Sequence, residues 1–307
     1  MASTAGHNNL KDKHHARRKF VENVFLFVCI SATLIGFLSL VLLIVGIAKD
    51  GASVLSWDFL NNFPSRKAER AGVKAALYGT FWLMGLTALF SIPLGVGAAI
   101  YLEEFAKKNW LTKIIQINIA NLAGVPSIVY GLLGLAVFVR ALSGVTDGSV
   151  FGIDGTSRSV ISGALTMSLL ILPMIITSTQ EALKAVPQSY REGALALGST
   201  TWETVRNHVL PPAMPGVLTS IILGLSRAIG ESAPLMTIGA LTYVAFVPKT
   251  PFDGFTVMPI QIFQWASRPQ DAFHKNAAGA ILVLMAVLII FNAAAIYLRQ
   301  VARRRLM

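Results

Sequence analysis

Long uncharged segments limit what this 307-residue chain can fold into. A helix of about 20 apolar residues is long enough to cross the hydrocarbon core of a membrane, which is about 30 Å thick. Such segments lie at residues 23–48, 75–102, 114–139, 159–180, 207–248 and 276–298, and only the fifth contains charged residues. Apolar residues make up 54% of the chain and charged residues 13%, with a mean hydropathy of +0.63, which would be unusual for a soluble domain. The sequence therefore predicts an all-α membrane protein with six transmembrane helices.

The fifth segment is too long for a single crossing, and its only formal charges are Arg227 and Glu231. We expect its helix to end between Pro234 and Ala240, with the remaining residues returning toward the membrane surface. The six predicted helices are about 23–48, 75–102, 114–139, 159–180, 212–238 and 276–298.

The basic residues, which give the chain a net charge of +11, lie mainly in the loops and tails beside the apolar segments. Membrane topology explains this pattern more simply than nucleic-acid binding, because Lys and Arg are enriched in cytoplasmic loops. The distribution favours cytoplasmic termini, with the basic segment 49–74 as an exception. We predict a cytoplasmic basic tail at 1–22, a six-helix transmembrane domain at 23–302 and a cytoplasmic basic end at 303–307. The tail is polar, and we expect it to be mostly disordered.

The sequence offers no pattern for catalysis or for a bound cofactor. It contains no phosphate-binding G-x-x-x-x-G-K-[ST] loop and no H-E-x-x-H metal motif. Cys29 is the single cysteine, so the chain can form no internal disulfide and no cysteine-cluster metal site. We therefore expect no catalytic residue, no metal and no cofactor in this chain.

Residues 181–211, between the fourth and fifth segments, have the pattern of two short helices joined by a turn. Pro187 suits the first turn of a helix, and Gly198 suits the left-handed residue that ends one. Thr200 and Glu203 then form a capping-box pair at the start of a second helix. This pattern could belong to a solvated connector, whereas a DNA-reading helix held between two membrane spans could hardly enter a major groove.

The same loop carries a resemblance to a known family. EGALALG at 192–198, followed after nine residues by HVLP at 208–211, resembles the E-A-A-x-x-x-G-x9-I-x-L-P loop of ABC importer permeases. His208 stands where that family usually has isoleucine, and Gly193 replaces an alanine. The resemblance implies a type I permease fold and a loop that docks on a cytoplasmic ATPase, which supplies the ATP chemistry. The residues that it assigns to this coupling are Glu192, Gly193, Ala194, Gly198, Leu210 and Pro211. We expect the second helix of the loop to end at Pro211 and Pro212.

A second motif narrows the resemblance. RAIGESAPL at 227–235 is similar to the R-A-I-G-E-[ST]-A-P-L signature of phosphate-specific importer permeases of the PstA type, and LSWDFL at 55–60 and GVKAALYGT at 72–80 also resemble that type. Relatives often carry an arginine about where Thr177 stands. The resemblance implies half of a phosphate pathway in a bacterial inner membrane. It also implies three kinds of protein partner: a PstC-like second permease in a heterodimer, two cytoplasmic ATPase subunits and an extracytoplasmic phosphate-binding protein.

The charges in the fifth segment allow two interpretations. Ser220, Gly224, Arg227, Ala228 and Glu231 recur at helical spacing and would form one small, polar face. Arg227 and Glu231 could simply neutralise each other as an i, i+4 pair, or Arg227 could face a translocated anion with Glu231 as its orienting partner. The resemblance favours the second interpretation. The predicted pathway residues are Arg227, Glu231, Ser220, Gly224 and Pro234.

Two other functions stay open from the sequence. The chain could import another oxyanion, such as sulfate or molybdate. It could also be a membrane sensor or scaffold that transports nothing.

Overall fold

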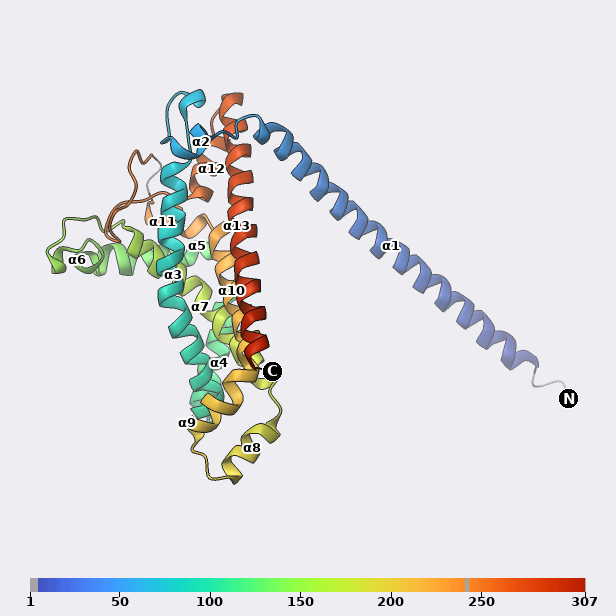
Figure 1. The fold of residues 1–307 in the computed structure, drawn as a ribbon. Coiled ribbons are helices and arrows are strands. Elements are labelled where there is room, and N and C mark those ends of the chain that lie inside the picture. The colour runs from blue at the N-terminus through green and yellow to red at the C-terminus, as the bar shows by residue number, and fades with distance from the viewer. Residues whose placement is uncertain (1–4, 241–242, 307) are drawn as a thin grey trace.

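Helices make up most of residues 5–240 and 243–306, the part of the chain that this computed structural model describes (Figure 1). The long helices are α1 (Ala5–Ala52), α3 (Lys74–Ile100), α7 (Val160–Lys184), α10 (Leu210–Gly230) and α13 (Asp271–Leu306). The shorter ones are α2 (Trp57–Asn61), α4 (Trp110–Leu122), α5 (Ser127–Gly134), α6 (Ser143–Thr146), α8 (Gln188–Ala196), α9 (Thr201–Thr204), α11 (Ala233–Ile238) and α12 (Met258–Ala266). Three π-helical segments are η2 (Tyr101–Phe105), η3 (Leu135–Ala141) and η5 (Val205–Val209), and two 3-10 turns are η1 (Ala68–Arg70) and η4 (Ser149–Phe151).

Within the described residues, five helical segments are long and apolar enough to cross a membrane. They are Val21–Ala52, Lys74–Phe105, Val160–Lys184, Thr201–Gly230 and Asp271–Val301. A sixth span is present if the bent pair Trp110–Leu122 and Ser127–Ala141 is counted as one. The predicted architecture of six spans therefore agrees with the structure when this pair is taken together.

The third predicted helix, at 114–139, was wrong as a continuous helix, because the chain bends by 106° between α4 and α5. Pro126 lies at the bend and forms the N-cap of α5. Proline has no amide hydrogen and disfavours helical geometry in the residue before it, so a helix readily ends there. The hydroxyl of Tyr130 donates a 2.8 Å hydrogen bond across the bend to the carbonyl of Leu122. This hydrogen bond stabilises the bend.

The amino-terminal segment also differs from the prediction, because α1 begins at Ala5 and the expected disorder of residues 1–22 was wrong for the described part. Residues 7–35 contain no glycine or proline, and adding residues to an existing helix needs no new nucleation. Arg18 and Glu22 form an exposed i, i+4 ion pair with 3.4 Å between their charged atoms. Helix α1 projects away from the other helices and meets α13 only through its carboxyl-terminal end (Figure 1).

Two predicted ends of the fifth helix were wrong. Pro211 and Pro212 do not stop the helix, since α9, η5 and α10 follow one another without a gap. The two prolines lie in the first turn of α10, directly after the π-helical segment η5. At the other end α10 stops at Gly230, and Glu231 has extended backbone angles, φ −80° and ψ 127°. Pro234 lies in the first turn of the separate helix α11. Its ring would clash with the carbonyl of Gly230 in a continuous helix, so α10 ends earlier than predicted.

Helix α7 lies at the centre of the bundle, packed against α3 and α10. Small residues allow this packing. A methyl group on Gly95 of α3 would lie 2.7 Å from the side chain of Ile175, and one on Gly224 of α10 would lie 3.0 Å from the same side chain. In a membrane, close approach of this kind is a main source of helix association. The largest buried cluster includes Met167, Ile171 and Ile175 of α7.

We predict that Gly79→Ala destabilises the folded protein, because a methyl group there would lie 2.0 Å from the carbonyl oxygen of Thr256. Overpacking of this kind costs about 1–3 kcal/mol. The matched control is Gly85→Ala in the same helix, since a methyl group at Gly85 meets nothing within 4 Å. Thermal unfolding in mild detergent should show a lower melting temperature for Gly79→Ala only. Equal melting temperatures for the two variants would contradict the packing described for α3.

Candidate coupling and translocation sites

The loop between α7 and α10 has the local structure that its residues predict. Gly198 follows α8 with a left-handed φ of +88°, and the amide of Ser199 donates to the carbonyl of Ala194 at 3.1 Å. The capping box is also present: the amide of Thr200 donates to Glu203 at 2.8 Å, and the amide of Glu203 donates to the Thr200 hydroxyl at 3.3 Å. Both predictions are confirmed, because turn and cap depend on neighbouring residues alone.

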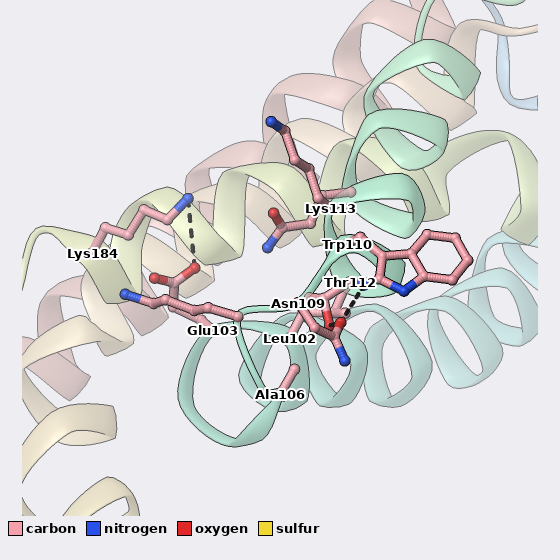
Figure 2. Close-up of a pocket in the computed structure, with 10 residues that line it drawn as sticks. Leu102, Glu103, Ala106, Asn109, Trp110, Thr112, Lys113 and Lys184 are labelled. Carbon is pink, nitrogen blue, oxygen red and sulfur yellow. Dashed lines mark hydrogen bonds and ion pairs between the residues drawn. The ribbon is translucent and has the colours of Figure 1, made fainter.

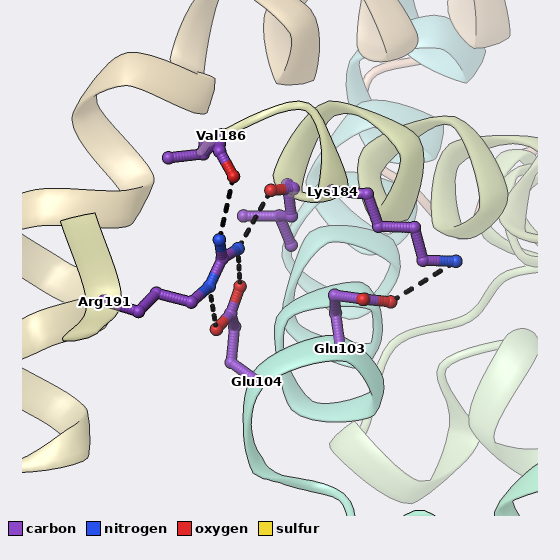
Figure 3. A network of polar contacts seen from close by, with 6 residues as sticks. Glu103, Glu104, Lys184, Val186 and Arg191 are labelled. Carbon is purple, nitrogen blue, oxygen red and sulfur yellow. Dashed lines mark hydrogen bonds and ion pairs between the residues drawn. The ribbon is translucent and has the colours of Figure 1, made fainter. Parts of the chain in front are cut away.

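Two ion pairs join the end of α3 to the region of this loop. Lys184 Nζ, at the end of α7, lies 3.5 Å from Glu103 Oε2 (Figure 2). Arg191 of α8 makes a closer, two-pronged contact with Glu104, in which its Nε and terminal nitrogen donate at 3.0 and 2.6 Å (Figure 3). The Arg191 guanidinium also donates to the carbonyls of Val186 and Leu183, each at 2.9 Å. Arg191 therefore connects α8, η2 and the end of α7.

The Arg191–Glu104 pair is well shielded, with only 15% and 7% of the two side chains exposed. The hydrogen bonds to Glu104 raise the pKa of Arg191 above its ordinary value, so this guanidinium stays charged. Sequence reasoning missed the pair, because its members are 87 positions apart and neither stands in a pattern that points to the other.

Further contacts hold the loop against the bundle. The rings of Phe105, next to Glu104, and Trp202 of α9 lie with centroids 6.3 Å apart. Beneath the loop is a small buried cluster made of Leu183, Val186, Val209, Ala213 and Val217. The loop is therefore attached to α3, α7 and α10 together, and a displacement of α8 would act on all three.

The outer surface of the loop carries three of the six residues predicted for coupling. Glu192, Gly193 and Gly198 are exposed there, and Leu197 at the tip has 90% of its surface exposed. A hollow of about 380 Å³ lies beside them, lined in part by Tyr190, Gly193 and His208. Ala194 is instead buried against the loop, and Leu210 and Pro211 lie half-buried at the start of α10. A methyl group on Gly193 would meet nothing within 4 Å, so the alanine typical of this loop would fit.

The predicted pathway residues fall into two groups. Arg227 Nε lies 3.4 Å from Glu231 Oε1, and the two side chains are 47% and 21% exposed. Ser220 and Gly224, by contrast, are buried; the Ser220 hydroxyl donates to the carbonyl of Gly216, and Gly224 packs on Ile175. The structure brings Arg227 and Glu231 together, whereas Ser220 and Gly224 are buried in the bundle. The single polar face expected from the spacing is therefore divided.

The break between α10 and α11 lies beside the other bent span. A methyl group on Gly131 of α5 would lie 2.7 Å from Pro234 Cα and 2.8 Å from the side chain of Thr237, so α5 and α11 cross closely here. Pro234 is buried in this contact. Non-helical backbone at membrane depth is tolerated only inside protein or beside a water-filled cavity. Sequence reasoning missed Gly131; the only local signal was Gly124 and Pro126 within the third apolar segment.

Two further residues bear on the anion hypothesis. The hydroxyl of Thr177, where relatives often have arginine, donates to the carbonyl of Pro173 in its own helix at 2.9 Å. Arg158 lies against the end of α11, where a methyl group on Gly239 would be 3.0 Å from its Nε. Arg158 is exposed and is a second cation beside α11 that the sequence did not single out.

Within the described residues, five apolar spans, a sixth bent one and an exposed helix–turn–helix loop between two spans define a multi-pass membrane protein. The family model for the binding-protein-dependent transport system inner membrane component matches residues 91–306. The chain belongs to that family.

Individual relatives agree with this result. The chain is 31% identical over 293 residues to the probable ABC transporter permease protein YqgI of Bacillus subtilis, covering 90% of this chain and 92% of that one. It is 30% identical over 296 residues to the phosphate transport system permease protein PstA of Mycobacterium leprae, covering 94% and 92%. Among solved structures, a bacterial alginate ABC transporter matches with a TM-score of 0.64 at 15% identity, over 93% of this chain and 97% of that chain.

The predicted class is therefore confirmed: the chain is the inner-membrane permease of an ABC importer, with the type I permease fold. Its relatives are transport subunits, and membership of the family implies an ATPase and a binding protein as partners.

We predict that Arg191→Gln lowers the stability of the permease more than Lys184→Gln does. Removing one partner of a shielded ion pair leaves an unpaired charge and costs about 3–5 kcal/mol, whereas an exposed pair contributes up to about 1 kcal/mol. Lys184 is 57% exposed and its pair with Glu103 is longer, which makes it a suitable control. Thermal unfolding in detergent measures the difference. Equal melting temperatures for the two variants would show that Arg191 does not fasten the loop.

Proposed function

We propose that this chain forms half of the pathway of an ATP-driven importer for inorganic phosphate, and that Arg227 compensates the charge of the passing anion. The observation that carries the proposal is the arginine itself. It lies in a transmembrane helix, half-exposed, three residues before that helix breaks at Gly230 and Glu231. Its surroundings, RAIGESAPL, match the phosphate permease signature, and relatives along nearly the whole chain are named as phosphate permeases.

The chemistry suits a phosphate ion. An anion with one to two charges cannot enter a low-dielectric passage without a counter-charge, and a guanidinium offers a planar fork of donors to its oxygens. A bare arginine would hold the anion too long, because conduction needs a site that also releases its ion. Glu231, 3.4 Å away, can take the guanidinium when the anion has left. At this distance the ion pair is loose enough for Arg227 to leave Glu231 for an anion, and the two side chains are close enough to pair again afterwards.

The same arginine supports a second permease as partner. Leu223, Arg227 and Gly230 lie on the exposed side of α10. A charged side chain facing lipid is costly, so intramembrane charges face protein or water. A PstC-like permease covering this side would close the pathway as a heterodimer. Two ATPase subunits would dock on the outer surface of the 181–211 loop and of its counterpart and would bind the ATP, so that this chain needs no cofactor and performs no catalysis. An extracytoplasmic phosphate-binding protein would deliver the ion.

Charge-neutral variants test the role of Arg227. If it serves the anion, Arg227→Gln should abolish or strongly reduce phosphate uptake while the assembled complex keeps its yield, and Glu231→Gln should slow turnover more than assembly. The double variant should stay inactive. Radiolabelled phosphate uptake and complex yield, measured for both singles and the double, decide the question. If the pair only holds the structure, both singles reduce assembly and the double recovers assembly and uptake together, which would contradict the proposal.

Competition separates phosphate from other anions. Excess unlabelled phosphate should suppress uptake, and equal concentrations of sulfate or molybdate should not. Suppression by sulfate or molybdate alone would assign a different oxyanion. If the assembled complex shows no anion uptake that requires this chain and the ATPase, the sensor or scaffold function remains.

We predict that Gly198→Val uncouples transport from ATP hydrolysis. Gly198 has a φ of +88°, a conformation that a β-branched residue adopts only at considerable cost, so the turn and the outer surface of the loop would shift. Gly193→Ala is the matched control, because its methyl group has free space in the same loop. Phosphate-stimulated ATPase activity and ATPase co-purification should fall for Gly198→Val only. Full coupling in that variant would remove the loop from the mechanism.

A further inference from the structure

A hollow of about 540 Å³ lies between η2, α4 and the end of α7, and the ion pair of Lys184 with Glu103 forms part of its lining (Figure 2). Lys108, Lys113 and Lys184 contribute to its lining, together with the polar side chains of Asn109, Thr112 and Gln116. Leu102 and Ala106 supply its apolar part. Cationic and uncharged polar groups therefore meet in one cavity of a size that accommodates a small headgroup.

The charge of the hollow favours an anion. Lys184 is the lysine of the three that has a carboxylate partner, Glu103 at 3.5 Å. Within the described residues, Lys108 and Lys113 make no ion pair, and Glu103 is the single acidic residue of the lining. Two lysines are thus left to neutralise a ligand, and the side-chain amides of Asn109 and Gln116 lie beside them, whereas the Thr112 hydroxyl donates to the carbonyl of Lys107 at 2.8 Å. A phosphate-type anion matches this combination of point charges and donors.

The position of the hollow indicates which phosphate source can reach it. It lies at the end of two spans, because η2 follows α3 directly and Lys184 is the last residue of α7. Trp110 at its rim is 73% exposed, and the neighbouring Leu111, Ile114 and Ile115 of α4 are exposed apolar residues. Tryptophan and lysine with adjacent apolar side chains are typical of the membrane–water interface. An amphiphile could place its head among the lysines and its chains along α4.

We propose that this hollow binds the phosphate-bearing headgroup of an anionic membrane lipid. Basic pockets between transmembrane helices on the cytoplasmic side recognise such headgroups. The cytoplasmic placement rests on the proposed function, whereas the hollow and its charge do not. Glu103 of the lining is adjacent to Glu104, which holds Arg191 of the coupling loop. A lipid bound here therefore stabilises the end of α3 to which that loop is attached.

The test measures binding of phosphatidylglycerol to the assembled, purified complex in phosphatidylcholine nanodiscs. The double variant Lys108→Gln with Lys113→Gln should bind phosphatidylglycerol about 25-fold more weakly, at about fivefold for each lysine near a membrane surface. Lys107→Gln is the matched control, since Lys107 is an exposed neighbour that does not line the hollow. Native mass spectrometry of retained lipid gives an independent readout.

The second arm of the experiment adds inorganic phosphate. It tests whether the hollow binds a lipid headgroup or free phosphate. Millimolar inorganic phosphate should leave the bound phosphatidylglycerol in place. Unchanged lipid affinity in the double variant, an equal loss in Lys107→Gln, or displacement of the lipid by inorganic phosphate would each overturn the proposal. Because binding is measured without transport, these results are independent of whether Arg227 serves phosphate uptake.

Discussion

The need to satisfy every backbone polar group inside a membrane governs this structure. The helical backbone is interrupted at the bend before Pro126 and again at Glu231, and both interruptions would be costly in contact with lipid. The fold meets this constraint by crossing α5 and α11 at Gly131 and Pro234 and by the hydrogen bond of Tyr130 to Leu122. The interrupted backbone and the charged pair Arg227–Glu231 thus occur in the same part of the bundle.

The coupling loop and the break are at opposite ends of one helical segment. From Thr201 to Gly230 the chain is helical without a gap, with the loop turn at one end and Arg227 near the other. The Arg191–Glu104 pair and the Phe105–Trp202 contact attach the loop to α3 as well. A movement imposed on α8 is therefore delivered to the helix that bears Arg227 and to the helix beside it. Under the proposed function, this continuity is a physical route from the ATPase to Arg227.

Features set by neighbouring residues could be predicted from the sequence, and features set by distant ones could not. The length of the apolar segments predicted the membrane spans. The residue types in the loop predicted the left-handed turn at Gly198 and the Thr200–Glu203 capping box. The bend before Pro126 was missed, and the end of α10 was predicted too late, because a proline in an apolar segment is compatible with a kinked helix as well as with a separate one. The Arg191–Glu104 pair was missed because only the packing of α8 on η2 brings the two charges together. For the same reason, spacing alone placed Ser220 and Gly224 with Arg227, although Ser220 is buried and Gly224 packs on α7.

The central claim is that the break after α10 opens onto the passage of the anion, and the reactivity of a cysteine placed there tests it most directly. In a Cys29→Ser background, Ser232→Cys reports on the break and Leu42→Cys reports on the exposed apolar surface of α1. A membrane-impermeant thiol reagent is applied to the assembled complex in proteoliposomes, with and without phosphate and its binding protein. The account predicts that Ser232→Cys reacts faster than Leu42→Cys and that phosphate during turnover changes its rate. Equal, slow labelling at both positions, unaffected by phosphate, would contradict it.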